Sequence, residues 1–210
     1  MDNGFSNMPK WLTSNSERLW TLNQGRPFYV TPWIKGRNLE HPEDYEKLGQ
    51  ALASLHVTSS RFLSNDAPFY DHIGLWKGHD RLFRKRMARA NQTDIRTRRW
   101  YKKFGEGCNR FSDRSWTKLI KPEIVNLLKK EIIHPALIHN DITSYNIIIS
   151  DDGGLFIIDW DRVTVGSIYV KIATALMNTT PFNSVFIYSL LKGYEELHPL
   201  DPNERKLIEL

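Results

Sequence analysis

The chain has 210 residues, a formal net charge of +5 and a pI of about 9.3. Its hydrophobic share of 40% and its seven Trp indicate a folded globular chain rather than a disordered one. A single cysteine, Cys108, excludes an internal disulfide framework and a Cys-rich zinc module, and no apolar run has the length of a membrane span. The first residues lack the apolar segment of a signal peptide, so we expect a cytoplasmic protein without a membrane partner.

The N-terminal part of the sequence predicts two strands and a helix. The strands are expected over 17–22 and 28–31, because a turn-rich cluster at 23–27 separates them and the second is aromatic and β-branched. The helix is expected over 41–57. Pro42 suits its first turn, and apolar residues recur at three- and four-residue steps: Tyr45, Leu48, Leu52 and Leu55.

Positive charge is concentrated between residues 81 and 103, where ten Lys or Arg stand against one acid, Asp94. The stretch from 80 to 104 has neither Pro nor Gly, so it predicts one long helix. Its cations are distributed around that helix, which favours a solvated surface over a nucleic-acid interface. We therefore do not expect a nucleic-acid partner, although binding through residues 81–103 stays open as an alternative.

The later part combines helices with one hairpin. Helices are expected over 115–133 with a break at Pro122, over 170–177 and 182–197, and from 202 onward. Residues 145–149 and 155–158 predict two strands joined by a turn at 151–154. Strands first, helices later and one hairpin between them predict an α+β fold.

The chemistry-bearing residues lie around this hairpin. His139 and Asp141 precede it, Asn146 begins its first strand and Asp159 follows its second. Phosphoryl transfer requires a group that accepts the proton of the attacking hydroxyl and oxygen ligands for Mg²⁺. Asp141 suits the first task, and Asn146 and Asp159, which a hairpin brings to one end, suit the second. Taken alone, Asp159 is more often a turn residue and His139 a core histidine bonded to backbone.

Residues 137–161 resemble the catalytic loop and metal-binding segment of the aminoglycoside phosphotransferase/choline kinase family, which is related to protein kinases. His139-Asn140-Asp141 is similar to the H-G-D of that family, Asn146 to its metal-binding Asn, and Ile158-Asp159-Trp160 to its counterpart of D-F-G. The resemblance implies a protein-kinase-like fold and an ATP- and Mg²⁺-dependent transfer to a hydroxyl of a small molecule. In that reading Asp141 and His139 are catalytic, and Asn146 and Asp159 hold the metal.

Residues 28–36 resemble the last N-lobe strand and the hinge of the family, which implies an adenine contact at Pro32, Trp33 and Ile34. The implied domains are a remnant of the N-lobe sheet with the hinge, residues 1–35, and a helical C-lobe, residues 36–210, incomplete at its C-terminus. The stretches WKGHDRLFRKR and GYEELHPLDPNE are similar to the bacterial spore-coat kinase-like (CotS-type) branch. This similarity implies a sporulation-associated protein of the cytoplasm or the spore coat, with other coat proteins as further partners.

The sequence departs from the family at three places. No Gly-rich loop precedes Phe28, Lys10 is the only lysine upstream of the hinge, and Tyr169 stands ten residues after Asp159, where the family often carries an Asp. We therefore expect a chain truncated at both ends, with weak Mg²⁺-dependent nucleotide binding and very slow or no transfer. A catalytically inactive kinase-fold protein of the spore coat is the alternative.

Overall fold

The computed structural model describes residues 4–63, 72–90, 92–133 and 135–209. The chain forms two compact units, one made of residues 1–64 and 135–200 and the other of residues 65–134 and 201–210. No helix in the described ranges is long and apolar enough to cross a bilayer. Every candidate site residue named above belongs to the first unit.

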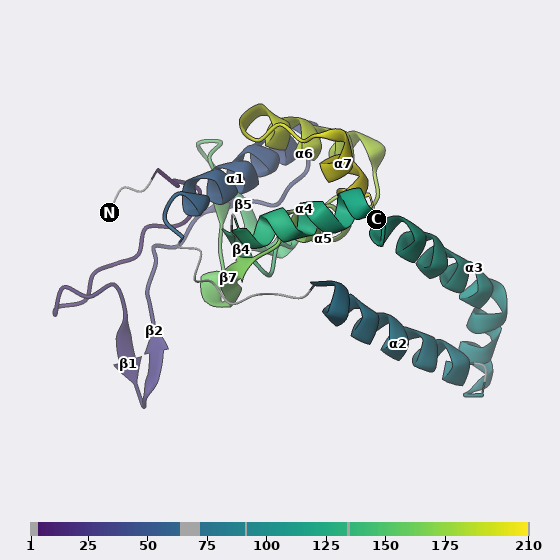
Figure 1. The fold of residues 1–210 in the computed structure, drawn as a ribbon. Coiled ribbons are helices and arrows are strands. Elements are labelled where there is room, and N and C mark those ends of the chain that lie inside the picture. The colour runs from purple at the N-terminus through teal and green to yellow at the C-terminus, as the bar shows by residue number, and fades with distance from the viewer. Residues whose placement is uncertain (1–3, 64–71, 91, 134, 210) are drawn as a thin grey trace. The chain divides into compact units, whose positions relative to one another are not determined.

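A short hairpin stands near the start of the first unit (Figure 1). In it β1 (Thr21–Asn23) pairs antiparallel with β2 (Arg26–Phe28), and Thr21 lies opposite Phe28. The turn residues Gln24 and Gly25 have φ angles of 51° and 76°, the left-handed pair that a type I′ turn requires. The turn occupies only residues 24 and 25, whereas the sequence predicted a turn over 23–27. The observed strands therefore lie closer to the turn than the strands predicted over 17–22 and 28–31.

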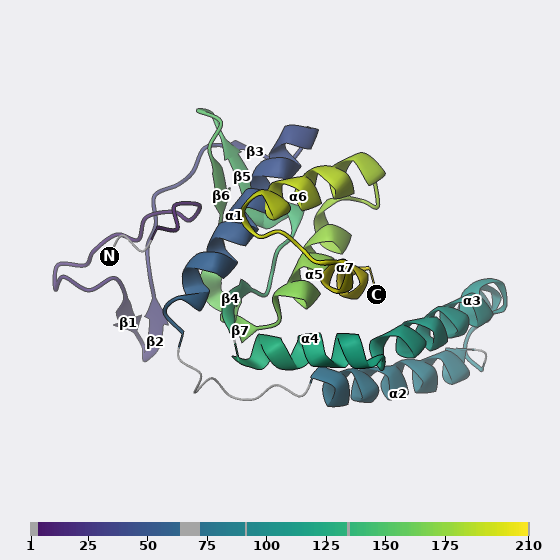
Figure 2. The ribbon, with the colours of Figure 1, turned by 45° about the horizontal axis from the view of Figure 1, so that its top comes forward.

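The longest helix of this unit is α1 (Pro42–Ser60), which confirms the helix predicted over 41–57. It lies beside α6 (Ser184–Leu197), as Figure 2 shows. A Cβ added to Gly49 would lie 2.0 Å from the carbonyl oxygen of Leu190, and one added to Gly193 would lie 2.0 Å from that of Glu46. The two helices therefore meet backbone to backbone, and only glycine fits at the crossing.

The hairpin predicted in the later part is present. β5 (Ile147–Ser150) pairs antiparallel with β6 (Leu155–Ile157), and β3 (Gly36–Arg37) extends the sheet in the order β3-β5-β6. Pairing between residues 36–37 and 149–150 fastens the segment after the predicted hinge to the hairpin. The sheet thus connects two parts of the chain that are more than a hundred residues apart.

A second small sheet carries the loop of interest. It joins β4 (Ala136–His139) to β7 (Val163–Gly166), with His139 opposite Val163, and α5 (Ile168–Thr179) follows. The pattern of the sequence did not predict β7, which is exposed or half-buried along its length. The core of the unit is formed by fully buried side chains from the three-stranded sheet and from α1, α5 and α6: Leu48, Ile147, Ile157, Ile172, Leu190 and Tyr194.

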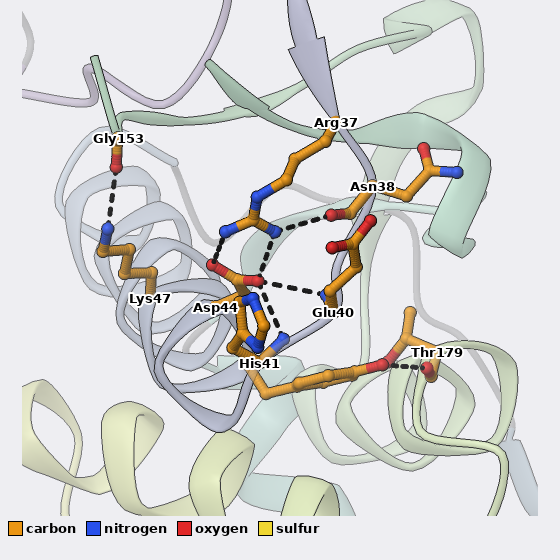
Figure 3. A network of polar contacts seen from close by, with 9 residues as sticks. Arg37, Asn38, Glu40, His41, Asp44, Lys47, Gly153 and Thr179 are labelled. Atoms are coloured by element: carbon orange, nitrogen blue, oxygen red, sulfur yellow. Dashed lines mark hydrogen bonds and ion pairs between the residues drawn. The ribbon is translucent and has the colours of Figure 1, made fainter. Parts of the chain in front are cut away.

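Polar contacts connect α1 to the strands (Figure 3). Both terminal nitrogens of Arg37 donate to the buried Asp44 carboxylate, at 2.6 and 3.0 Å, and the backbone amides of Glu40 and His41 donate to it at 3.0 Å. Burial opposes ionisation, but these hydrogen bonds outweigh it and lower the pKa of Asp44 to about 2. Lys47 also donates to the Gly153 carbonyl at 2.7 Å, so α1 anchors both β3 and the turn of the β5–β6 hairpin.

The second unit is helical and corrects one prediction. Instead of a single helix over 80–104, α2 (His72–Ala90) and α3 (Ile95–Leu119) form a helical hairpin (Figures 1 and 2). The chain breaks because Asp94 acts as an N-cap, and its carboxylate accepts the backbone N–H groups of Arg96 and Thr97. Helices α4 (Pro122–Ile133), whose start at Pro122 was predicted, and α7 (Pro202–Ile208) complete the unit.

Candidate active site

His139 stands at the end of β4 and is only 2% exposed. The backbone N–H of Asp141 donates to its Nδ1 at 3.3 Å, so Nδ1 is an acceptor and the proton lies on Nε2. That Nε2 is 3.0 Å from the carbonyl oxygen of Ile158, to which it donates. Burial lowers the pKa of His139 although the nearby Asp159 and Asp141 carboxylates oppose the shift. A neutral histidine therefore connects the loop before the hairpin to the segment after it.

Asn146 makes a second connection at the same place. It ends the short helix η1 (Ser144–Asn146), and its side-chain amide donates to the Asp141 carbonyl at 2.8 Å. Its own carbonyl oxygen accepts the backbone N–H of Ile158 at 2.9 Å. These hydrogen bonds connect Asp141 and Asn146 to Ile158, the residue before Asp159. We call His139, Asp141, Asn146, Ile158 and Asp159 together the loop junction.

Asp159 has an unusual backbone for a residue other than glycine. Its φ and ψ are both 63°, in the left-handed region, and it precedes the short helix η2 (Trp160–Arg162) without capping it through its side chain. Such a conformation is costly and is found where the surrounding structure imposes it, often at functional sites. The Asp159 side chain is exposed, and its carboxylate accepts no hydrogen bond from the described residues.

The donor set at the loop junction suits a hard cation shared with a phosphate. Two carboxylates, of Asp141 and Asp159, and the amide oxygen of Asn146 are the oxygen donors that Mg²⁺ prefers, and Mg²⁺ commonly takes only one or two carboxylates with phosphate oxygens and water. No group of three His, Cys, Asp or Glu side chains suited to a metal occurs in the described part of the chain. The set therefore fits a metal that arrives with a nucleotide better than a permanently bound one.

The predicted adenine contacts take no part in this hydrogen-bond network, as far as the described residues show. Pro32, Trp33 and Ile34 form an irregular stretch between β2 and β3, and the Trp33 side chain is 91% exposed. The hydrogen bonds between described residues that connect Asp141, Asn146 and Ile158 do not include residues 32–34. The strand β3, which follows the predicted hinge, holds the hinge in place. Its Gly36 packs so closely on β5 that an added Cβ would lie 2.1 Å from the Ile149 carbonyl oxygen.

The N-terminal segment also packs around Asp159, which the sequence did not indicate. Asn7 accepts the backbone N–H of Ile157 at 2.7 Å and donates its side-chain amide to the Leu155 carbonyl at 3.0 Å. Phe5 packs edge-on against Trp160, with ring centroids 5.6 Å apart. These contacts span about 150 residues of sequence, and Asn7 extends the edge of β6 directly before the candidate metal ligand.

Tyr29 is a second contact that the sequence did not reveal. Its ring stacks on Trp11 at 4.4 Å, and burial followed by the nearby Asp161 carboxylate raises the pKa of its hydroxyl. Tyr169, which replaces the acid expected from the resemblance, is buried in the first turn of α5. The next acid after Asp159 along the sequence is Asp161, in η2, and the Tyr29 side chain interacts with it.

A model of the phosphotransferase enzyme family matches residues 3–208, nearly the whole chain. The chain belongs to this family. A comparison with curated proteins finds no match.

Solved structures show the fold. An aminoglycoside phosphotransferase from Alicyclobacillus acidocaldarius superposes with a TM-score of 0.84 at 16% identity over 99% of this chain. Over the same share, spectinomycin phosphotransferase bound to AMP gives 0.65 at 20% identity, and a choline kinase from Streptococcus pneumoniae gives 0.54 at 14%. This chain spans 64%, 66% and 63% of those chains. The fold is the kinase-like α+β fold that the sequence predicted.

Proposed function

We propose that the protein transfers the γ-phosphoryl group of ATP to a hydroxyl of a small molecule. The observation that carries the proposal is the loop junction, where the Asn146 side chain donates to the Asp141 carbonyl and the Asn146 carbonyl accepts the N–H of Ile158, next to the left-handed Asp159. The likeness to spectinomycin phosphotransferase, whose structures hold AMP or ADP with spectinomycin, supports a nucleotide and a small hydroxyl compound as ligands.

The roles follow from the chemistry of each group. The Asp141 carboxylate takes the proton of the acceptor hydroxyl while the oxygen bonds to the γ-phosphorus and the bond to the leaving ADP breaks. Asn146 and Asp159 would hold Mg²⁺, which neutralises charge on the phosphates when bound. The neutral His139 positions the segments of Asp141 and Asp159 through its hydrogen bonds to the Asp141 N–H and the Ile158 carbonyl. Pro32, Trp33 and Ile34 would contact adenine.

The finer assignments complete the proposal. Residues 1–35 correspond to part of an N-lobe sheet with its hinge, and residues 36–210 to the helical lobe. The similarity of WKGHDRLFRKR and GYEELHPLDPNE to the CotS-type branch supports a protein of the cytoplasm or the spore coat, with coat proteins as partners. The second candidate is a catalytically inactive member of the same fold with a structural role, which the exposed Trp33 at the predicted adenine contact favours.

Measurement of ADP release separates the two candidates. The protein is incubated with Mg²⁺–ATP and a panel of hydroxyl compounds such as choline, spectinomycin and aminoglycosides. We expect at least one compound to raise ADP release, and Asp141→Asn to reduce it by about 10²–10⁴-fold while ADP binding is retained. Asp151→Asn, a matched change at the far turn of the hairpin, should leave the rate unchanged. Near-wild-type release in Asp141→Asn, or no release with any acceptor, would replace the enzyme proposal with the structural one.

A further inference from the structure

The helical hairpin of the second unit carries charge that its own structure does not neutralise. Of the ten cations between residues 81 and 103, Arg84 is paired with Asp80 and Asp113, Arg98 donates to the Thr93 carbonyl, and Lys103 lies over the Phe104 ring. The other seven are exposed and, within the described ranges, have no ion pair or side-chain hydrogen bond: Arg81, Lys85, Arg86, Arg89, Arg96, Arg99 and Lys102. We call these seven residues the basic tip, because the turn between α2 and α3 lies in their midst.

The placement of these cations conflicts with the electrostatics of α3. The N-terminal end of a helix carries partial positive charge and favours acids. Here the first turns of α3 hold Arg96, Arg98 and Arg99 and no acid, and Asp94, the N-cap, is the only acid between residues 81 and 103. Cations in the first turns of a helix lower its stability, so their presence here suggests a function outside the helix. Binding of an anionic ligand is such a function.

The break at residue 94 puts cations on both outer sides of the hairpin. Arg81, Lys85 and Arg89 recur every four residues and share one side of α2, away from the buried Met87. Arg96 and Arg99 share a side of α3 away from the buried Gly105. A bilayer surface or a straight duplex reaches one such side at a time, whereas a flexible polyanion can follow both.

Aromatic side chains lie among the cations. Trp100, 45% exposed, stands one turn before Phe104 on α3, and their ring centroids are 5.9 Å apart. Single-stranded nucleic acids bind to surfaces of this composition, because cations contact the backbone while bases stack on aromatic rings. Arg predominates over Lys in the tip, and its planar guanidinium suits phosphate oxygens.

We propose that the basic tip binds single-stranded nucleic acid. This reverses the expectation from the sequence, which rested on one continuous helix with its charge distributed around it. Every residue of the basic tip belongs to the second unit, and none of them is assigned a role in the proposed phosphoryl transfer.

The test uses the full chain and a fluorescent RNA single strand of about 20 nucleotides, followed by anisotropy at about 50 and about 200 mM salt. Arg96→Gln/Arg99→Gln/Lys102→Gln removes three tip cations. Lys121→Gln/Lys129→Gln/Lys130→Gln removes three exposed cations beside and on α4 and is the matched control. We expect the tip variant to bind at least about tenfold more weakly, with a salt slope smaller by about 2, and the control to change by less than about threefold.

Further arms decide the nature of the ligand. Trp100→Ala should weaken binding about 5- to 150-fold if bases stack on the indole. A duplex of the same length and vesicles with anionic lipid should bind more weakly than the single strand. Equal loss in the tip and control variants, no binding at low salt, an unchanged Trp100→Ala affinity, or tighter binding of duplex or vesicles would each overturn the proposal.

Discussion

Asp44 shows how one buried carboxylate fastens α1 to the strand after the predicted hinge. Its pKa of about 2 lies below the ordinary 3.8, so its contribution to stability is complete above about pH 4 and is lost as the pH falls toward 2. We expect Asp44→Asn to lower the free energy of unfolding by about 1–3 kcal/mol at pH 7, as measured by urea denaturation.

The control for this prediction is Asp151→Asn. Asp151 pairs with Lys35, but both side chains are largely exposed, so the change in stability should stay below about 0.5 kcal/mol. The Asp44 variant should also lose less stability than the wild type between about pH 4 and pH 2. An equal loss of unfolding free energy in the two variants at pH 7 would show that the Arg37–Asp44 contact stabilises the fold no more than an exposed ion pair does.

His56 introduces a second dependence on pH. The ring is buried with Nδ1 2.9 Å from the Tyr194 hydroxyl, and burial, followed by His198, lowers its pKa to about 3. The unfolded histidine takes up a proton near pH 6.5 and the folded one does not, so the fold loses stability as the pH falls from 6.5 toward 3.

Replacement of His56 by glutamine isolates its contribution to the pH dependence of stability. His56→Gln keeps a polar partner for Tyr194 and does not titrate. We expect the variant to be less stable at pH 7 but to lose less stability than the wild type between about pH 6.5 and pH 4, in urea melts at each pH. Identical pH slopes in the two proteins would contradict the account of His56.

At the scale of elements, the α1–α6 crossing depends on two glycines. Because an added Cβ on Gly193 would lie 2.0 Å from the Glu46 carbonyl oxygen, Gly193→Ala must separate the helices. We expect it to lower the free energy of unfolding by about 1–3 kcal/mol or more, as overpacking does. Gly107→Ala on α3 is the control, since nothing lies within 4 Å of its Cβ position. Removal of a mid-helix glycine should there stabilise by about 0.5–1 kcal/mol.

The same scale shows which elements a sequence can predict. The helix over 41–57 and the hairpin around 151–154 depend on local signals, Pro42 at the first turn and an Asp-Gly turn, and both are present. The break inside residues 80–104 was missed because it involves neither Gly nor Pro. It depends instead on the Asp94 side chain, whose carboxylate accepts the backbone N–H groups of Arg96 and Thr97 and so starts a new helix at this point.

At the scale of the whole molecule, the sequence predicted the kinase-like fold and identified His139, Asp141, Asn146 and Asp159 as candidate residues, but it did not predict the contacts that support them. The spacing of His139, Asp141, Asn146 and Asp159 is a local motif. The packing of Asn7 on β6, the Trp11–Tyr29 stack and the β3–β5 pairing are long-range, and no periodicity encodes them. The left-handed backbone of Asp159 is likewise imposed by the surrounding structure rather than by its residue type.

The central claim, that the loop junction holds a metal–nucleotide, is tested most directly by calorimetric titration of ADP with and without Mg²⁺. The proteins are the wild type, Asp159→Asn and Asp151→Asn. Asparagine tolerates a left-handed backbone, so Asp159→Asn removes the charge without straining the chain. We predict Mg²⁺-dependent binding by the wild type and by Asp151→Asn, and binding by Asp159→Asn that is weaker by about tenfold or more, a loss of about 1.4 kcal/mol or more. Equal affinities in all three proteins, or affinities that do not change when Mg²⁺ is removed, would contradict the claim.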